Sequence, residues 1–234
     1  MDFLSRVFPF LFSYSYNRSF VNKLRQKRHL FFLNFIQHIS SLSAASVVRI
    51  LDIGGTYHYW KSAGLLDHTR YHLTLLNIDA EYLPETIKGF STVDGNAMSL
   101  DYPNNYFDIV FSNSVIEHMG SRQGQMRMAR EVQRVGRSYY IQTPSKWFLL
   151  EPHCRIPFFQ FLPKYFRAFL IYKFKINYFP TKSTYTECLK VSDSTIMLSY
   201  REFKSLFTEA EIIKETLFGI TKSYTAVYLG SKIE

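Results

Sequence analysis

The sequence predicts an α/β fold of the nucleotide-binding kind, and two segments carry that prediction. The first is residues 47–60, VVRILDIGGTYHYW, which open with a short β-branched run typical of a strand buried on both faces. Asp52 ends the run, and Gly54 and Gly55 follow it, so a tight turn can form and the backbone can approach a ligand closely. A helix over residues 57–66 can then begin with its free N–H groups facing that turn.

The second segment is residues 106–119, YFDIVFSNSVIEHM. Its first half predicts another short buried strand, and SVIEHM leaves the carboxyl end of that strand. In open parallel sheets the ligand crevice lies outside the carboxyl ends, where the strand order reverses. Asn113, Glu117 and His118 are therefore expected near the glycine turn.

The remaining elements follow from apolar spacing and capping residues. Residues 19–38 repeat apolar side chains near helical spacing, with lysine and arginine between them. Residues 121–135 predict a second helix that begins at a capping serine, and Gly136 is a natural stop. Residues 137–143 predict a strand, and after a polar patch from Lys182 a last helix is expected over residues 199–207.

Length, charge and cysteine content limit the function classes. A chain of 234 residues with 47% hydrophobic composition fits one α/β domain with additions. Residues 1–43 and 155–180 each carry a net charge of +5, so the basicity belongs to two flanking segments. Cys154 and Cys188 alone argue against a disulfide scaffold. No stretch reaches the roughly 20 apolar residues of a membrane span, so we expect a cytoplasmic protein that can touch a membrane peripherally.

Two motifs resemble those of class I S-adenosylmethionine-dependent methyltransferases. Residues 52–56, DIGGT, resemble the D/E-x-G-x-G motif, and residues 107–118 match F-D-x-V-x-S-x-x-V-x-E-H closely. Thr56 departs from the first motif at the second glycine, where its β-carbon disfavours a positive φ. The sequence does not match the dinucleotide-binding fingerprint G-x-G-x-x-G, because Thr56 and Tyr59 occupy its second and third glycine positions.

The resemblance implies a Rossmann-like fold. Its sheet would be seven-stranded and mostly parallel, with the last strand antiparallel and helices on both faces. Residues 211–218 and 223–229 would form the closing antiparallel hairpin at one sheet edge. Residues 1–43 would be an N-terminal basic and aromatic helical segment, and residues 44–234 the methyltransferase domain. Within it, residues 145–198 would be an acceptor-site insertion or cover.

The second strand, HLTLLNI at residues 72–78, bears on ribose recognition. In nucleotide folds a carboxylate at the end of strand two accepts hydrogen bonds from both ribose hydroxyls. Asp79 has the carboxylate, whereas Asn77 stands where the family usually has its acid when strand ends are aligned. Both side chains point the same way along a strand, so the choice stays open. The alternative for Asp79 is an ordinary surface turn.

Residues 91–98, STVDGNAM, resemble the family's G-D-A segment, with Asn96 at the carboxylate position. That side chain would bind the adenine amino group through its amide oxygen, and the next backbone N–H would contact a ring nitrogen. The alternative is an Asp-Gly-Asn turn. The resemblance thus implies S-adenosyl-L-methionine as cofactor. The cofactor-binding candidates are Asp52, Gly54, Gly55, Thr56, Asn77, Asp79, Asn96, Ala97 and Asn113.

Methyl transfer is an in-line displacement in which the protein supplies mainly alignment and desolvation. A base is needed only when the acceptor loses a proton. Candidate bases are His118 and His153, with Glu151 able to orient the second imidazole and Glu117 as a further choice. No zinc-type spacing of cysteine and histidine is present, so a metal is not implied.

Two interpretations of function remain open. One is a methyltransferase for a small acceptor, lipid-linked or glycan-related, with residues 155–180 as a mobile, largely helical cover and an anionic membrane surface as partner. The other is a methyltransferase-fold protein that binds nucleic acid or a protein partner through its basic aromatic segments. The sequence lacks an N-P-P-Y-like motif after the fourth strand, which argues against nucleic acid.

Overall fold

The structure, a computed structural model, describes residues 30–41, 47–63, 70–80, 87–150, 156–174 and 184–230, without the side chains of residues 191 and 193. The chain divides into two compact units. We call residues 37–148 and 194–234 the sheet unit, and residues 1–36 and 149–193 the helical unit. Each is considered by itself, and the domain boundaries expected from the sequence stay a prediction.

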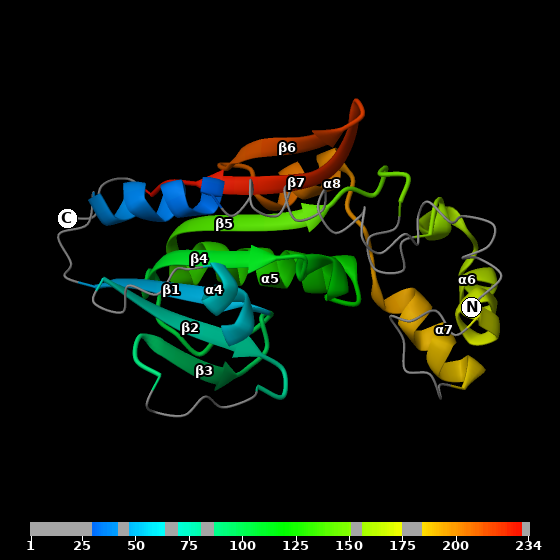
Figure 1. Cartoon of the computed structure of the whole chain (residues 1–234), viewed down its shortest axis with the longest axis horizontal. Helices are drawn as coiled ribbons and strands as arrows, with labels where there is room; N and C mark the ends of the chain where they lie inside the picture. The colour runs from blue at the N-terminus through cyan, green and yellow to red at the C-terminus, as the bar shows by residue number, and fades with distance from the viewer. Residues whose placement is uncertain are drawn as a thin grey trace. The chain divides into compact units, whose positions relative to one another are not determined.

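The sheet unit contains a seven-stranded sheet of order β3-β2-β1-β4-β5-β7-β6 (Figure 1). Its strands are β1 Val48–Ile53, β2 Tyr71–Asn77, β3 Phe90–Asp94, β4 Phe107–Asn113, β5 Gly136–Pro144, β6 Glu211–Leu217 and β7 Ile220–Tyr228. Strand β7 runs antiparallel to both β5 and β6, and the other pairs are parallel. The predicted Rossmann-like sheet with an antiparallel last strand is confirmed.

Strand β1 lies between β2 and β4, so the strand order reverses there. Its last residue, Ile53, pairs with Leu76 of β2 and with Ser112 of β4. The carboxyl ends of these three strands therefore lie side by side at one edge of the sheet. This is the edge at which α/β folds bind ligands.

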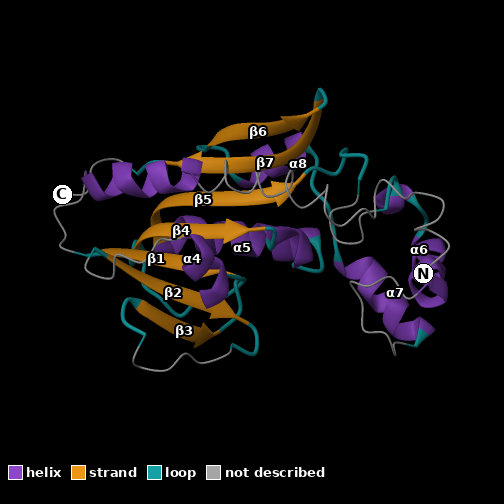
Figure 2. Cartoon of the chain, in the orientation of Figure 1, coloured by secondary structure: helices purple, strands orange, loops and turns teal. Residues whose placement is uncertain are grey.

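Helices flank the sheet (Figure 2), and all of them except the short 3₁₀ helix begin close to where the sequence predicts. They are α4 Tyr57–Ala63, the short 3₁₀ helix η1 Ile116–His118, α5 Arg122–Val135 and α8 Tyr200–Leu206. Ser121 caps α5 by accepting a hydrogen bond from the Gly124 N–H at 2.9 Å. Ser199 caps α8 in a reciprocal capping box with Glu202, as Ser/Thr-x-x-Glu sequences favour. Residues 30–41 are also helical, whereas the start of the predicted 19–38 helix falls outside the described residues.

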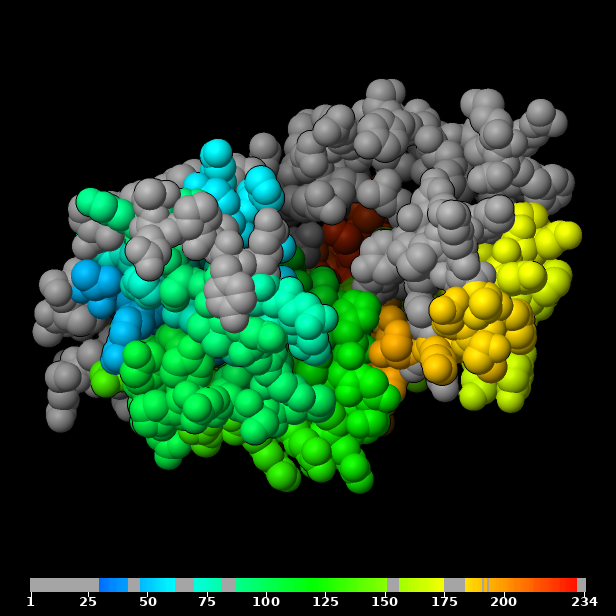
Figure 3. Space-filling model, turned by 90° about the horizontal axis from the view of Figure 1, so that it is seen from below, coloured from blue at the N-terminus to red at the C-terminus, as the bar shows by residue number. Residues whose placement is uncertain are grey.

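The helical unit contains η2 Phe159–Phe161, α6 Lys164–Phe174 and α7 Tyr185–Ser194. Its small core joins Phe159, Ala168, Ile171 and Cys188, and Figure 3 shows α6 in yellow beside α7 in gold. Helix α7 was not predicted, because its residues looked like a polar patch. None of the described helices is long and apolar enough to cross a bilayer.

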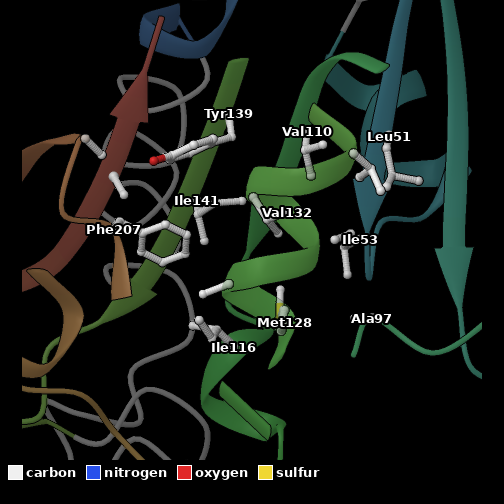
Figure 4. Packing of buried hydrophobic residues seen from close by; sticks show 14 of the residues in the cluster. Leu51, Ile53, Ala97, Val110, Ile116, Met128, Val132, Tyr139, Ile141 and Phe207 are labelled. Atoms are coloured by element: carbon white, nitrogen blue, oxygen red, sulfur yellow. The ribbon is translucent and has the colours of Figure 1, made fainter. Parts of the chain in front are cut away.

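The main core lies between α5 and one face of the sheet (Figure 4). Met128 and Val132 of α5 are fully buried there with Leu51, Ile53 and Val110. Burial of each such side chain contributes about 1.5–3 kcal/mol. Because strand side chains alternate, the residues between these point to the opposite face, and the side chain of Asp52 is one of them.

The closing hairpin is tighter than the sequence predicts. Strand β7 begins at Ile220 instead of residue 223. Phe218 and Gly219 form the turn, with φ of 51° and 78°. Two successive positive φ values are typical of a two-residue type I′ turn, whose twist matches that of the flanking strands.

Candidate functional site

The glycine turn after β1 is held by residues that are adjacent in space but distant in sequence. Gly54 has a φ of 80°, and its N–H donates to the carbonyl of Leu76 at 2.8 Å. A β-carbon on Gly54 would overlap Cγ2 of Val115, and one on Gly55 would overlap the carboxylate of Asp52. Neighbouring side chains therefore require glycine at both positions, and the role of the two glycines in cofactor binding stays a prediction.

Thr56 caps the helix that follows the turn. Its carbonyl and Oγ1 both accept from the N–H of Tyr59, at 3.1 and 3.3 Å. The positive φ of the turn lies at Gly54, and Thr56 does not have one. The departure from the second glycine of the motif therefore causes no backbone strain.

Asp52 is buried beneath the turn. Its Oδ2 accepts a hydrogen bond of 2.6 Å from Nε1 of Trp60, a fully buried residue of α4 that packs edge-on against Phe111. Burial raises the pKa of Asp52 to about 7, and the Trp60 hydrogen bond opposes that rise only in part. Asp52 thus joins the glycine turn to α4.

The two candidates at the end of β2 have different surroundings. The amide of Asn77 donates to the carbonyl of Gly55 at 2.7 Å, so it supports the glycine turn. Asp79 is exposed, with a left-handed φ of 55°, and its backbone N–H donates to Oδ1 of Asp94 at 3.2 Å. Within the described part of the chain, the Asp79 carboxylate makes no hydrogen bond or ion pair, so it can accept hydroxyl donors.

The loop after β3 forms the Asx-type turn that was the alternative for this segment. Oδ1 of Asn96 accepts from the N–H of Met98 at 2.9 Å, two residues on. An amide oxygen has two lone pairs, and Asn96 is exposed, so one acceptor position remains. Ala97 is buried, and its backbone N–H has no hydrogen-bond partner among the described residues.

The end of β4 holds a strained turn. Asn113 is exposed, and Ser114 has a φ of 60°, which is uncommon for a residue other than glycine. Gln142 of β5 fixes it by accepting from the Ser114 N–H at 3.0 Å and from its hydroxyl at 3.1 Å. This turn presents Val115 to Gly54, so the two sequence motifs interlock at the reversal of strand order.

Glu117 and His118, adjacent in sequence, face different surroundings. Glu117 is fully buried, with its Oε2 accepting from the Thr143 hydroxyl at 3.0 Å. His118 is exposed, with its Nδ1 3.4 Å from the hydroxyl of Thr195. The other two predicted catalytic residues, Glu151 and His153, lie outside the described residues.

Four further residues shape this edge and were not among the predicted site residues: Trp60, Asp94, Ser114 and Val115. Trp60 is the fourth residue of α4, eight residues after Asp52, and its contact with Asp52 depends on how the turn between strand and helix is folded. Asp94 pairs with Asn77 across β2 and β3, and that pairing depends on a strand register that one sequence does not reveal. Among the described residues, this edge offers the exposed carboxylate of Asp79, the amide oxygen of Asn96 and the backbone N–H of Ala97.

Comparisons with known proteins agree with this geometry. Residues 51–139 match a family model described as a methyltransferase domain. The matched stretch contains the glycine turn, the ends of β2 and β3, and the strained turn after β4. A comparison with curated proteins found no match.

Solved structures are similar in fold at low sequence identity. The methyltransferase domain of bacterial CtHen1-CN is 12% identical, with a TM-score of 0.51 over 88% of this chain and 100% of that one. PH0226 from Pyrococcus horikoshii OT3 is 13% identical, with a TM-score of 0.50 over 97% and 98%. A candidate O-methyltransferase from Nostoc punctiforme PCC 73102 is 12% identical, with a TM-score of 0.45; 83% of this chain aligns and spans only 56% of that one.

The buried carboxyl of Asp52 predicts a pH-dependent stability. Its folded pKa of about 7 lies above its ordinary value of 3.8, so its stabilising contribution is present at low pH and is lost as the pH rises through about 7. Asp52→Asn keeps an acceptor for Trp60 but carries no charge. Urea unfolding of both proteins between pH 4.5 and 8 should show the variant gaining relative stability with pH, by about 1.4 kcal/mol per unit of pKa shift.

Trp60→Phe is the matched variant, because it removes the hydrogen bond that lowers the pKa of Asp52. Its loss of stability should extend to a higher pH than that of the wild type. Parallel stability curves for the wild type and Asp52→Asn would show that this carboxyl does not titrate as described.

Proposed function

We propose that this protein, whose residues 51–139 match a family model of a methyltransferase domain, transfers a methyl group from S-adenosylmethionine to a small acceptor that is lipid-linked or glycan-related. The observation that supports the proposal best is the interlock of Gly54 with Val115 at the reversal of strand order. Both motifs that resemble the family meet there. When bound, S-adenosylmethionine would supply the methyl group of its sulfonium. The sulfur is a good leaving group, because it departs as a neutral thioether.

We assign cofactor binding to the open edge around the glycine turn. Asp79 would accept hydrogen bonds from both ribose hydroxyls, since its carboxylate is exposed and makes no other hydrogen bond with the described residues. Asn77 would support cofactor binding indirectly, because its amide holds the Gly55 carbonyl of the glycine turn. The amide oxygen of Asn96 would accept a hydrogen bond from the adenine amino group, and the Ala97 N–H would donate one to a ring nitrogen. The remaining members of the proposed site are Asp52, Gly54, Thr56 and Asn113.

Asp79→Ala should weaken binding of S-adenosylhomocysteine more than Asn77→Ala does. Loss of charge-assisted hydrogen bonds costs about 1.5–3 kcal/mol, or roughly ten- to 100-fold in affinity. Asn77→Ala loses only the support of the turn, so its effect should be smaller. Calorimetry measures both, with Glu211→Ala as a control that removes an exposed carboxylate from the distant strand β6. The opposite ranking would move the ribose contact to Asn77.

For a hydroxyl acceptor, we propose His118 as the general base. The β4 strand brings it to the cofactor edge, and the Thr195 hydroxyl, 3.4 Å from Nδ1, can orient its ring. His153, oriented by Glu151, is the second candidate. Glu117 is less suited, because its carboxylate is buried against Thr143.

His118→Ala should lower turnover by roughly 10²–10⁴ while leaving the affinity for S-adenosylhomocysteine unchanged. The rate of methyl transfer and the cofactor affinity are measured side by side, with His153→Ala as the parallel variant. If both variants keep full turnover at neutral pH, the enzyme works by positioning alone and neither histidine is catalytic.

The acceptor class rests on charge. Residues 1–43 and 155–180 each carry a net charge of +5 and would favour an anionic surface or headgroup. The enzyme would then be cytoplasmic and peripheral to a membrane. Incubation with labelled S-adenosylmethionine, followed by separation of lipid, RNA, protein and small-molecule fractions, identifies the acceptor. Label in RNA or protein would favour the alternative of a nucleic-acid or protein partner bound through the basic aromatic segments.

A further inference from the structure

Helix α6 exposes most of its aromatic side chains. Tyr165, Phe166, Phe169 and Tyr172 are each between 47 and 61% exposed. The same helix buries a different stripe, centred on Ala168 and Ile171, against Phe159 and Cys188 of the helical unit. Phe166 and Phe169 lie away from this buried stripe, whereas Tyr172 packs edge-on against Tyr185 of α7, with ring centres 6.1 Å apart.

These rings form one continuous surface, which we call the aromatic ridge. At 3.6 residues per turn, the four rings and Lys173 fall within about one third of the helix circumference. Phe166 and Phe169 stack with ring centres 6.3 Å apart. Soluble monomers rarely expose such a contiguous apolar patch without a partner.

The chemistry of the ridge fits an anionic lipid surface. Lys164 and Lys173 lie at the two ends of α6, and residues 155–180 contain five cations and no acid. Tyrosine and phenylalanine with flanking lysines are typical of the interface between headgroups and acyl chains, where long cationic stems can extend to the phosphates. Helix α7 contributes Glu187 and Asp193, and the carboxylate of Glu187 accepts hydrogen bonds from the N–H and hydroxyl of Thr184.

The length of α6 decides its orientation. Eleven residues span about 16 Å, roughly half of the hydrocarbon core of a bilayer. The helix would therefore lie in the plane of the interface. In that orientation the ridge can face the lipid while Ala168 and Ile171 stay packed in the protein.

We propose that α6 is a membrane-docking helix, which inserts its aromatic ridge into the interface of anionic membranes. This inference deepens the proposed function, on which its choice of an anionic partner rests. It assigns the docking to specific rings and adds an apolar, salt-resistant component to an attraction that charge alone would make salt-sensitive.

The first test is vesicle co-sedimentation of the full chain with phosphatidylcholine vesicles that contain or lack phosphatidylglycerol. Phe166→Ser/Phe169→Ser should lower partitioning to anionic vesicles at least tenfold at both low and high salt. Phe218→Ser is the matched control, because Phe218 is 90% exposed in the β6–β7 turn of the other unit, and it should bind as the wild type does. Equal binding by the double variant would overturn the proposal.

The second test reports insertion directly and uses a variant that keeps an aromatic ring. Brominated anionic lipids should quench the fluorescence of Phe169→Trp beyond that of the wild type, and should not do so for Phe218→Trp. Binding without this quenching would leave the electrostatic attraction in place and remove the insertion.

Two further outcomes separate this proposal from the rest of the account. No vesicle binding by a wild-type protein that still binds S-adenosylhomocysteine would overturn membrane docking and leave the methyltransferase function standing. Self-association that the double variant abolishes, without vesicle binding, would assign the ridge to a second copy of the chain and also overturn the proposal.

Discussion

The contact between Gly54 and Val115 is the constraint on which the site depends. Strands β1 and β4 are neighbours in the sheet, so the turns that follow them compete for the same space at its carboxyl edge. Glycine without a β-carbon lets Val115 fill that space, and the left-handed Ser114 aims Val115 there. The strain at Ser114, of order 1–3 kcal/mol for such a residue, is held by two hydrogen bonds to Gln142.

Around this contact the polar side chains support the turn from below. Asp52 is tied to Trp60 and Asn77 to the Gly55 carbonyl, so two of the expected ligand-binding residues are already engaged with the protein. For Asp52 the cost of burial exceeds the gain from the hydrogen bond, since its pKa is raised. Asp79, by contrast, is an exposed carboxylate at the end of β2, and its backbone N–H donates a hydrogen bond to Asp94.

Much of the fold could be predicted because it depends on local sequence. Buried strands and the caps at Ser121 and Ser199 follow from short patterns, whereas the closing hairpin was implied by the resemblance and its second strand begins earlier than predicted. Helix α7 was missed although Thr184 and Glu187 form a capping pair that the Ser/Thr-x-x-Glu spacing indicates. The site was harder to predict, because the partner of Asp94 depends on the pairing of β2 with β3 and the partner of Gly54 on the path of the chain after β4.

The most direct test of the account is calorimetric titration of S-adenosylhomocysteine into the wild type and into folded Gly54→Val. The account predicts one site per chain in the wild type and no measurable binding in the variant, because its side chain would displace Val115 and the turn. Gly219→Val is the control, since Gly219 has nearly the same φ, 78°, but no neighbour within 4 Å, and its affinity should be unchanged. Equal affinity in wild type and Gly54→Val would contradict the account.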